Sequence, residues 1–182
     1  VDHQNSYTVE ASEYSIGKDT LTGHWEMMGI NTTKPFVTFT DTGFPAELIK
    51  ELEDKSGYKF IGNKAASGTV IIDELAPIQE KDHSLIIYTS ADSVLQIAAS
   101  EQVIGLDNLY KVCEIARDIT NKPEWNVARV IARPFIKNKD GSYTRTSNRH
   151  DYAVNPPSET CLDALKDSGL STISIGKIFD IF

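Results

Sequence analysis

The chain has 182 residues, of which 40% are hydrophobic and 24% charged, the composition of an ordinary globular protein with one domain, or one domain and part of another. Its formal net charge of −8 makes nucleic acid and acidic membrane surfaces poor partners. No apolar run approaches the length of a membrane span, and no signal peptide is visible. We therefore expect a cytoplasmic protein without nucleic-acid or membrane partners.

The first part of the chain predicts two helices separated by extended segments. Residues 7–14 alternate loosely and favour a strand. Asp19 suits the N-cap of a helix over residues 20–28. Residues 36–40 are aromatic and β-branched, which favours a strand or an extended loop. A clear amphipathic helix over residues 45–56 has proline at its first position and is followed by a glycine.

The middle of the chain predicts buried strands and a long helix. Residues 58–61 favour a short strand and residues 84–88 a strongly apolar one. Residues 68–75 and 92–99 fit either a strand or a helix. A convincing helix begins at Asp107, because the apolar residues after it recur on one face.

A hairpin follows this helix. Residues 127–136 form the longest strand candidate of the chain. Residues 138–142 contain Asp-Gly, which readily adopts positive φ and favours a tight turn. Residues 143–146 are then expected to form the returning strand.

The last part predicts one more helix and one more strand. Ser158 suits an N-cap, with Leu162 and Leu165 facing inward and Gly169 ending the helix. Residues 172–175 favour a final strand. Strands and helices are mixed without strict alternation, so we expect an α/β or α+β fold: a mixed sheet flanked by helices.

Two cysteines and the apolar end of the chain carry further expectations. Cys113 and Cys161 lie among apolar neighbours in predicted helices, which is typical of reduced core thiols, although spacing alone leaves a disulfide open. The chain lacks an initiator Met, and residues 178–182 are largely apolar. We interpret this as a piece of a longer protein; the alternative is a buried terminal strand.

The segment Gly17-Lys18-Asp19-Thr20 is the first candidate for chemistry. It is not a phosphate-binding P-loop, because Ser12 stands where that motif needs glycine and Asp19 interrupts the Lys-Thr pair. If Thr20 begins a helix, however, free backbone amides and the helix dipole favour a phosphate on its oxygen. The alternative is a helix cap on the surface.

Polar residues near predicted strands form the second group of candidates. Ser90 and Asp92 follow an apolar strand, where ligand-binding residues often lie, although Asp92 also suits a helix cap. Arg129 and Arg133 share one face of a strand, and Arg145 lies on the returning strand. Converging guanidinium groups bind phosphate well, but solvated or paired arginines fit the same pattern.

The four histidines show no pattern of a metal site. His3, His24, His83 and His150 are scattered, and no pair has the spacing of a zinc-binding motif. We expect structural roles for them.

Read together, several segments resemble bacterial phosphopentomutases, in the order in which they occur in that family and over nearly the whole chain. The matching stretches are residues 17–26 (GKDTLTGHWE), 61–64 (IGNK), 67–69 (SGT), 88–99 (YTSADSVLQIAA), 129–135 (RVIARPF), 144–146 (TRT), 148–152 (NRHDY) and 175–178 (IGKI).

This resemblance implies a two-domain enzyme of the alkaline phosphatase superfamily. It would interconvert ribose 1-phosphate and ribose 5-phosphate, and the deoxyribose equivalents, through a metal-bound phosphothreonine and a sugar bisphosphate. Two manganese ions would be its cofactors and glucose 1,6-bisphosphate its activator. A phosphoglycerate mutase is disfavoured, because that sister family uses serine as the nucleophile.

The resemblance also assigns individual residues by position. Thr20 matches the phosphorylated threonine. The residues that match the family's substrate site are Arg129, Arg145, Asp92 and Lys177, with Ser90, Val94 and Ile131 lining the sugar pocket.

One departure limits what this chain is expected to do alone. The family's manganese ligands lie in Asp-Ser-Val-Gly, Thr-Ala-Asp-His-Gly and Asp-His-Thr-Arg signatures, none of which occurs here. We expect no metal site in the chain and no turnover by it. Residues 35–154 would form the substrate-covering cap, and residues 1–34 and 155–182 would be pieces of the catalytic core. The alternative function is a non-catalytic sugar-phosphate-binding module.

Overall fold

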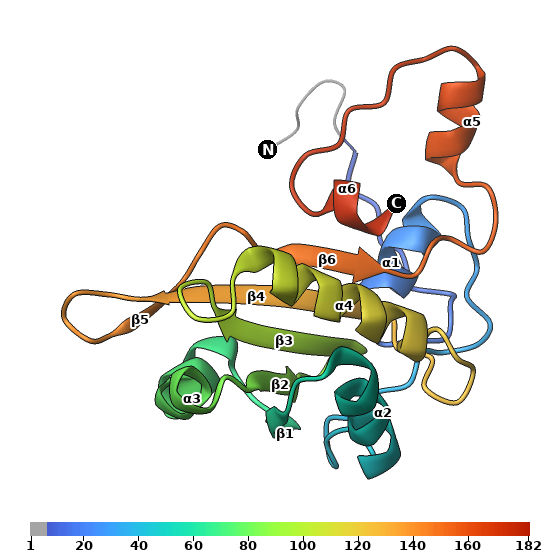
Figure 1. The fold of residues 1–182 in the computed structure, drawn as a ribbon. Helices are drawn as coiled ribbons and strands as arrows, with labels where there is room; N and C mark the ends of the chain where they lie inside the picture. The colour runs from blue at the N-terminus through green and yellow to red at the C-terminus, as the bar shows by residue number, and fades with distance from the viewer. Residues whose placement is uncertain (1–6) are drawn as a thin grey trace.

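The computed structural model describes residues 7–182, which form a mixed sheet of six strands flanked by helices (Figure 1). This is the expected fold class. The strands are β1 (Phe60–Ala65), β2 (Leu85–Thr89), β3 (Val94–Ser100), β4 (Arg129–Lys137), β5 (Tyr143–Arg145) and β6 (His150–Ala153). The helices are α1 (Thr20–Met27), α2 (Ala46–Ser56), α3 (Gly68–Asp82), α4 (Leu106–Thr120), α5 (Cys161–Asp167) and α6 (Ile178–Ile181).

The sheet has the order β1-β2-β3-β4-β5, and β6 also pairs with β4. Helix α3 connects the parallel pair β1 and β2, and helix α4 connects the parallel pair β3 and β4. The pairs β2–β3 and β4–β5 are antiparallel. Strands β5 and β6 pair with successive parts of β4, residues 135–137 and 129–132. The long strand β4 therefore carries both segments that follow it.

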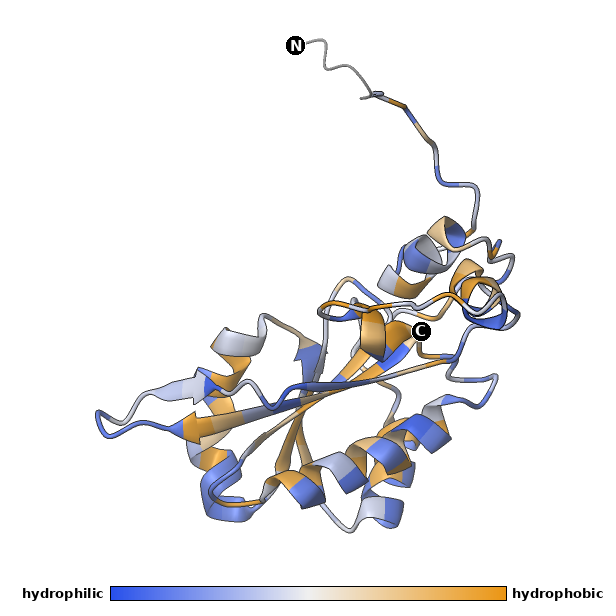
Figure 2. Ribbon diagram, turned by 90° about the horizontal axis from the view of Figure 1, so that it is seen from above, coloured by the Kyte–Doolittle hydropathy of each residue, from blue (hydrophilic) through white to orange (hydrophobic). Residues whose placement is uncertain are grey.

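Helices α2 and α4 cover one face of the sheet with a continuous apolar core. Strands β2 and β3 are buried along their whole length. Apolar side chains that alternate along β2, β3 and β4 pack there with the stripes of the two helices, the buried members including Leu85, Ile87, Leu95, Ile97, Val130, Leu48, Leu52, Leu109, Val112 and Cys113. Figure 2 shows these apolar residues concentrated in the strands, while the helices are striped with polar residues. Burial of this stripe explains why the α4 sequence gave so clear a helical period.

The opposite face of the sheet is only partly covered. Helix α3 packs Ile71, Ile72 and Ala76 against the alternate strand residues, among them Tyr88 and Phe135. Beyond the N-terminus of α3, side chains of β3 and β4 on this face line a cavity instead of a core, including Val94, Gln96, Arg129, Ile131 and Arg133. The uncovered part of this face positions the candidate site.

A third, smaller cluster joins α1 and α6 to one end of the sheet. Leu21 and Trp25 of α1 pack with Ile181 of α6 and with Ala128, which directly precedes β4. The indole of Trp25 also meets the ring of Phe36 edge to face, with centroids 5.7 Å apart. Segments from the two ends of the chain are thus packed together beside the sheet, as Figure 1 shows at the upper right.

The capped helices and the hairpin confirm the sequence predictions. Asp19 caps α1, and Gly57 ends α2 in the left-handed conformation at φ 76°. Pro45 is the N-cap of α2 rather than its first residue. In the turn of the β4–β5 hairpin, Gly141 has φ 87°, and the amide of Asn138 donates to the carbonyl of Ser142. The two ambiguous segments became helix α3 and strand β3.

Other predictions are wrong. Residues 7–14 and 172–175 form no strand, and Ile173 and Ile175 are more than four-fifths exposed, because no described segment pairs with them. The residues at 178–182 include the short helix α6 rather than a terminal strand. These segments have no partner strand among the described residues, and an alternating apolar pattern does not by itself form a strand.

The helix near residue 160 also differs from the prediction. Thr160, not Ser158, caps α5, in a capping box with Asp163. No residue of α5 is buried, so Leu162 and Leu165 do not face a core among the described residues. Cys113 is a buried free thiol as expected, whereas Cys161 is exposed, which contradicts its assignment to the core. None of the helices in the described part of the chain is both long and apolar enough to span a bilayer.

Candidate functional site

Thr20 lies at the N-terminus of α1, where its own sequence holds it. The Asp19 carboxylate accepts hydrogen bonds from the amide of Thr22 at 2.9 Å and from its hydroxyl at 2.7 Å. This fixes the first turn, so the remaining free amides and the positive end of the helix dipole lie beside Thr20. The side chain of His24 contacts the Thr20 carbonyl oxygen at 2.7 Å, a local structural role as expected.

The carboxylate of Asp92, in the loop between β2 and β3, holds Thr20 in place. The Thr20 hydroxyl donates to Oδ2 of Asp92 at 2.8 Å, and its amide donates to Oδ1 at 3.2 Å. Asp92 sits in the loop between β2 and β3, where the amide of Ser93 donates to Oδ1 at 2.9 Å. Two residues that were predicted separately are therefore in direct contact.

Arg129 extends this contact into a chain of buried charges. Its guanidinium group donates to Oδ2 of Asp92 at 2.8 Å and to Oδ2 of Asp151 at 3.0 Å. Arg149 donates to the same Asp151 oxygen at 2.6 Å. The Asp151 side chain is fully buried and that of Arg129 is 8% exposed. We call Thr20, Asp92, Arg129, Asp151 and Arg149 the paired cluster.

A cavity of about 250 Å³ opens next to the paired cluster. Five of the predicted site residues line it: Ser90, Val94, Arg129, Ile131 and Arg145. The structure thus brings together a hydroxyl, two apolar side chains and two guanidinium groups around one space. Such a space suits a small polar molecule with an anionic group.

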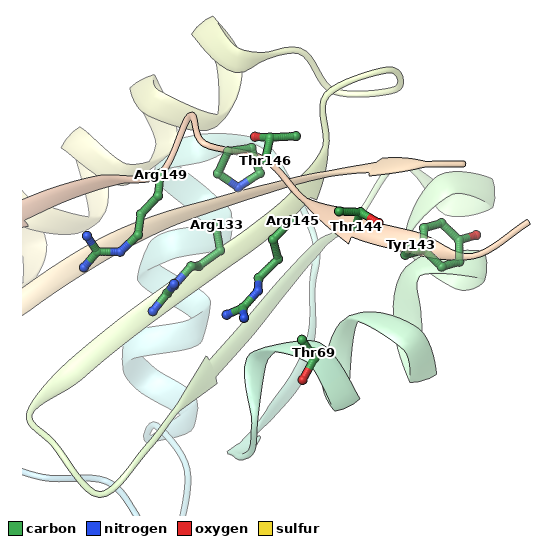
Figure 3. Close-up of a pocket in the computed structure, with 8 residues that line it drawn as sticks. Thr69, Arg133, Tyr143, Thr144, Arg145, Thr146 and Arg149 are labelled. Carbon is green, nitrogen blue, oxygen red and sulfur yellow. The ribbon is translucent and has the colours of Figure 1, made fainter. Parts of the chain in front are cut away.

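A second cavity, of about 550 Å³, is lined by three arginines (Figure 3). Arg133 of β4, Arg145 of β5 and Arg149 extend into it, and Arg145 reaches toward Thr69 at the start of α3. Arg133 and Arg145 line both cavities. The prediction that Arg129 and Arg133 share a face of one strand is confirmed, because both line the smaller cavity.

The arginines are close enough to perturb one another. Burial lowers the pKa of Arg133, and the neighbouring charges of Arg149 and Arg145 lower it further. Burial raises the pKa of Tyr88, while the charges of the same three arginines oppose that rise. Both effects show a concentration of positive charge that an anion would relieve.

Lys177 lies apart from these cavities. It is exposed, precedes α6 as its N-cap and lines neither of them. The ring of His150 contacts that of Tyr110 at a tilt and meets that of Tyr152 edge to face, a structural role. His83 is exposed at the end of α3, and His3 lies outside the described residues.

Several residues of the site were not singled out from the sequence. Asp151 and Arg149 stand in one of the matching segments, yet no local pattern indicates that Asp151 joins two arginines. The apolar strand that contains Tyr88 indicates a core residue rather than a site residue. Their roles depend on which strands are neighbours: the pairing of β6 with β4 places Asp151 opposite Ile131.

The described residues contain no group of three or more side chains from His, Cys, Asp and Glu that fits a metal ion. Asp92, which contacts Thr20, and Asp151, which contacts the same arginine as Asp92, are both already paired with guanidinium groups. The donor set present here therefore does not suit the two manganese ions that the resemblance implies.

Fold and site together define an α/β domain with a cationic, sugar-sized cavity beside a threonine at a helix N-terminus. Comparison with curated proteins identifies the relatives. The chain is 59% identical over 177 residues to the phosphopentomutase of Clostridium beijerinckii. It is 56% identical over 182 residues to that of Clostridium perfringens, and 64% identical over 171 residues to that of Agathobacter rectalis. These matches confirm the resemblance to phosphopentomutases.

The matches also show how much of those relatives the chain represents. They cover 94% to 100% of this chain but only 43% to 46% of the relatives. The chain therefore spans about 45% of the length of the curated phosphopentomutases that it matches. No protein-family model matches it.

Proposed function

We propose that this chain is the substrate-binding part of a phosphopentomutase, an enzyme that interconverts ribose 1-phosphate and ribose 5-phosphate and their deoxyribose equivalents. The observation that carries the proposal is the direct contact between Thr20 and Asp92 beside an arginine-lined cavity. In this proposal residues 35–154, which contain the whole sheet, form the cap. Residues 1–34 and 155–182, which carry α1, α5 and α6, belong to the catalytic core.

The proposed reaction transfers a phosphoryl group between Thr20 and the sugar. The bond from phosphorus to Oγ1 of phosphothreonine breaks while a sugar hydroxyl oxygen bonds to phosphorus, and the hydroxyl proton passes to Oγ1. The product is a sugar bisphosphate. Its other phosphoryl group then returns to Thr20 by the reverse process, which leaves the isomeric monophosphate.

The predicted site residues have matching roles in this proposal, both those that line the cavity and Asp92 and Lys177, which do not line it. Arg129, Arg145 and Lys177 bind phosphate oxygens, since guanidinium and ammonium groups donate to them strongly. Ser90 and Asp92 bind sugar hydroxyls, and Val94 and Ile131 contact the sugar ring. Asp92 also orients the hydroxyl of unphosphorylated Thr20, as its 2.8 Å contact indicates.

The proposal places the metal chemistry outside this chain. Two manganese ions would be held by the parts of a phosphopentomutase that the chain does not cover, and glucose 1,6-bisphosphate would serve as activator. We therefore expect the isolated chain to bind sugar phosphates without interconverting them.

Turnover by a full-length parent tests the assignment of Thr20. We expect the parent to convert ribose 1-phosphate to ribose 5-phosphate in manganese, and Thr20→Ala to reduce the rate to background, because no oxygen remains to carry the phosphoryl group. Thr42→Ala is the matched control, since the Thr42 hydroxyl contacts only the neighbouring carbonyl oxygen and Thr42 lines neither cavity. Wild-type turnover in the Thr20→Ala parent would contradict the proposal.

Binding by the isolated chain tests the second candidate, a sugar-phosphate-binding module. We expect calorimetric titration with ribose 5-phosphate to give binding that Arg145→Ala weakens by about tenfold or more. Lys139→Ala, at the exposed tip of the hairpin, removes the same charge outside both cavities and should bind normally. Absence of heat at millimolar ribose 5-phosphate would contradict the binding-module hypothesis. It would not bear on turnover by the full-length parent.

A further inference from the structure

The N-terminus of α3 faces the cavities without an internal partner for its first amides. This helix has 15 residues, Gly68–Asp82, and its N-cap Ser67 makes no side-chain hydrogen bond to the first turn. The Ser67 hydroxyl instead lies 3.1 Å from the hydroxyl of Thr69. Because the first amides of a helix have no intrahelical acceptor, those of Gly68 and Thr69 remain available to an anion.

A buried hydroxyl points independently to a ligand at the same place. Tyr88 is 1% exposed, and its hydroxyl has no hydrogen-bond partner among the described residues. Tyr88 lines the smaller cavity together with Ser67 and Gly68. A tyrosine hydroxyl in such a position normally has a partner, because an unpaired buried donor is costly.

The cations beside this hydroxyl also lack an acidic partner. Within residues 7–182, neither Arg133 nor Arg145 forms an ion pair with a carboxylate. The only hydrogen bond of the Arg133 side chain there goes to the neutral Gln96 side chain, at 3.0 Å. Two guanidinium groups and a helix N-terminus therefore meet at a place where the described residues supply no negatively charged acceptor.

Glycine at position 68 leaves room for the Tyr88 hydroxyl. A Cβ atom at this residue would lie 2.6 Å from the Tyr88 hydroxyl oxygen and 3.4 Å from Nη1 of Arg145. Position 68 needs no positive φ, so its backbone tolerates alanine. A methyl group at position 68 would therefore overlap the Tyr88 hydroxyl, so that the tyrosine ring or the first turn of α3 would have to move.

We propose that the first turn of α3, the Tyr88 hydroxyl, Arg133 and Arg145 form a cradle for a phosphate monoester group. This inference rests on the proposed function, which it deepens: the cradle holds the phosphate that is not being transferred. Arg129 lines the same cavity and reaches Asp92, which holds Thr20. A sugar phosphate anchored in the cradle would therefore direct its sugar toward the threonine.

Amide shifts of the isolated chain test the cradle directly. On titration with ribose 5-phosphate, and separately with inorganic phosphate, we expect the amide resonances of Gly68 and Thr69 to be among those that move most. We expect Gly68→Ala to weaken ribose 5-phosphate binding about tenfold or more, because the methyl group displaces the Tyr88 hydroxyl and the first turn of α3 from their places in the cradle. Tyr88→Phe should weaken it roughly threefold to tenfold, the loss of one hydrogen bond.

Matched controls separate loss of the cradle from loss of the fold. Gly23→Ala adds the same methyl where no atom lies within 4 Å, and Tyr58→Phe removes a hydroxyl outside the cavities. Both should bind like the wild type. If Gly68→Ala unfolds, Tyr88→Phe decides alone, because removing an unpartnered hydroxyl should leave the melting temperature unchanged or raised.

The outcomes distinguish this inference from the proposed function. If Arg145→Ala weakens binding while the two cradle variants bind normally and the two amides do not move, the cradle is overturned and the function stands. If ribose 5-phosphate does not bind at millimolar concentration, the cradle is overturned together with substrate binding by this chain. Shifts with both ligands, lost in Gly68→Ala, establish it.

Discussion

The arginines of the site fall into two groups that differ in their partners. In the paired cluster, Arg129 and Arg149 share the buried carboxylate of Asp151, and Arg129 also reaches Asp92. On the cradle side, Arg133 and Arg145 have no carboxylate among the described residues. Paired charges keep their geometry without a ligand, whereas unpaired charges that share a cavity are prepared for an anion. The comparison distinguishes arginines that stabilise the protein's own structure from arginines that are available to bind phosphate.

The largest effect on stability should come from breaking the paired cluster. Asp151→Asn keeps the shape but removes the charge that Arg129 and Arg149 share. We expect the free energy of unfolding to fall by about 3 kcal/mol, since the buried Arg129 then keeps only the Asp92 carboxylate and Arg149 keeps no carboxylate among the described residues. Urea denaturation followed by circular dichroism measures the change.

A carboxylate elsewhere provides the control for this variant. Asp73 is exposed on α3 and takes part in none of the ion pairs of residues 7–182. Asp73→Asn should change the free energy of unfolding by less than about 0.5 kcal/mol. Equal effects of the two substitutions would mean that Asp151 contributes no more than a surface charge.

A smaller effect is expected where Thr20 joins the cluster. Thr20→Val keeps the branched shape and the amide but loses the hydroxyl that donates to Asp92 at 2.8 Å. We expect the free energy of unfolding to fall by about 1 kcal/mol, which is typical of one hydrogen bond to a charged group at a partly exposed site. Thermal unfolding measures it, with Thr42→Val as the control, because the Thr42 hydroxyl contacts only the neighbouring carbonyl. An equal loss in both variants would assign no special weight to the contact with Asp92.

The sequence predicted the parts of the fold whose causes are local. Asp19 as an N-cap, Gly57 as a stop and the Asp-Gly turn before β5 depend on side chains within a few residues. The strand β6 escaped prediction, because it is short and partly polar and its place in the sheet depends on pairing with β4. Residues 172–175 failed for the opposite reason: they alternate as a strand does but have no partner strand in the described part of the chain.

The candidate site shows the same division. Thr20, Asp92, Arg129 and Arg145 were candidates from local patterns that left alternatives open, and the resemblance to family motifs then assigned them to the site. Their convergence in space could not be read from spacing. Asp151 and Tyr88 were missed, because a buried acid and a buried hydroxyl look like ordinary strand residues until their neighbours are known. Contacts between residues far apart in sequence decide both cases, such as the 72 positions between Thr20 and Asp92.

The smallest effect on stability, and the sharpest test of the comparison, concerns Arg133. If the cradle arginines await an anion, the empty protein gains little from them, and Arg133→Met should leave the free energy of unfolding unchanged or raise it by about 0.5 kcal/mol. Burial and the repulsion of Arg145 and Arg149 already lower the pKa of Arg133. Removing the charge of Arg133 therefore removes a repulsion, whereas Asp151→Asn removes an attraction. The same variant should weaken binding of ribose 5-phosphate several-fold. The free energy of unfolding and the affinity for ribose 5-phosphate would then change independently or in opposite directions. If Arg133→Met instead lowered the free energy of unfolding by about 3 kcal/mol, the two groups of arginines would not differ in the way described.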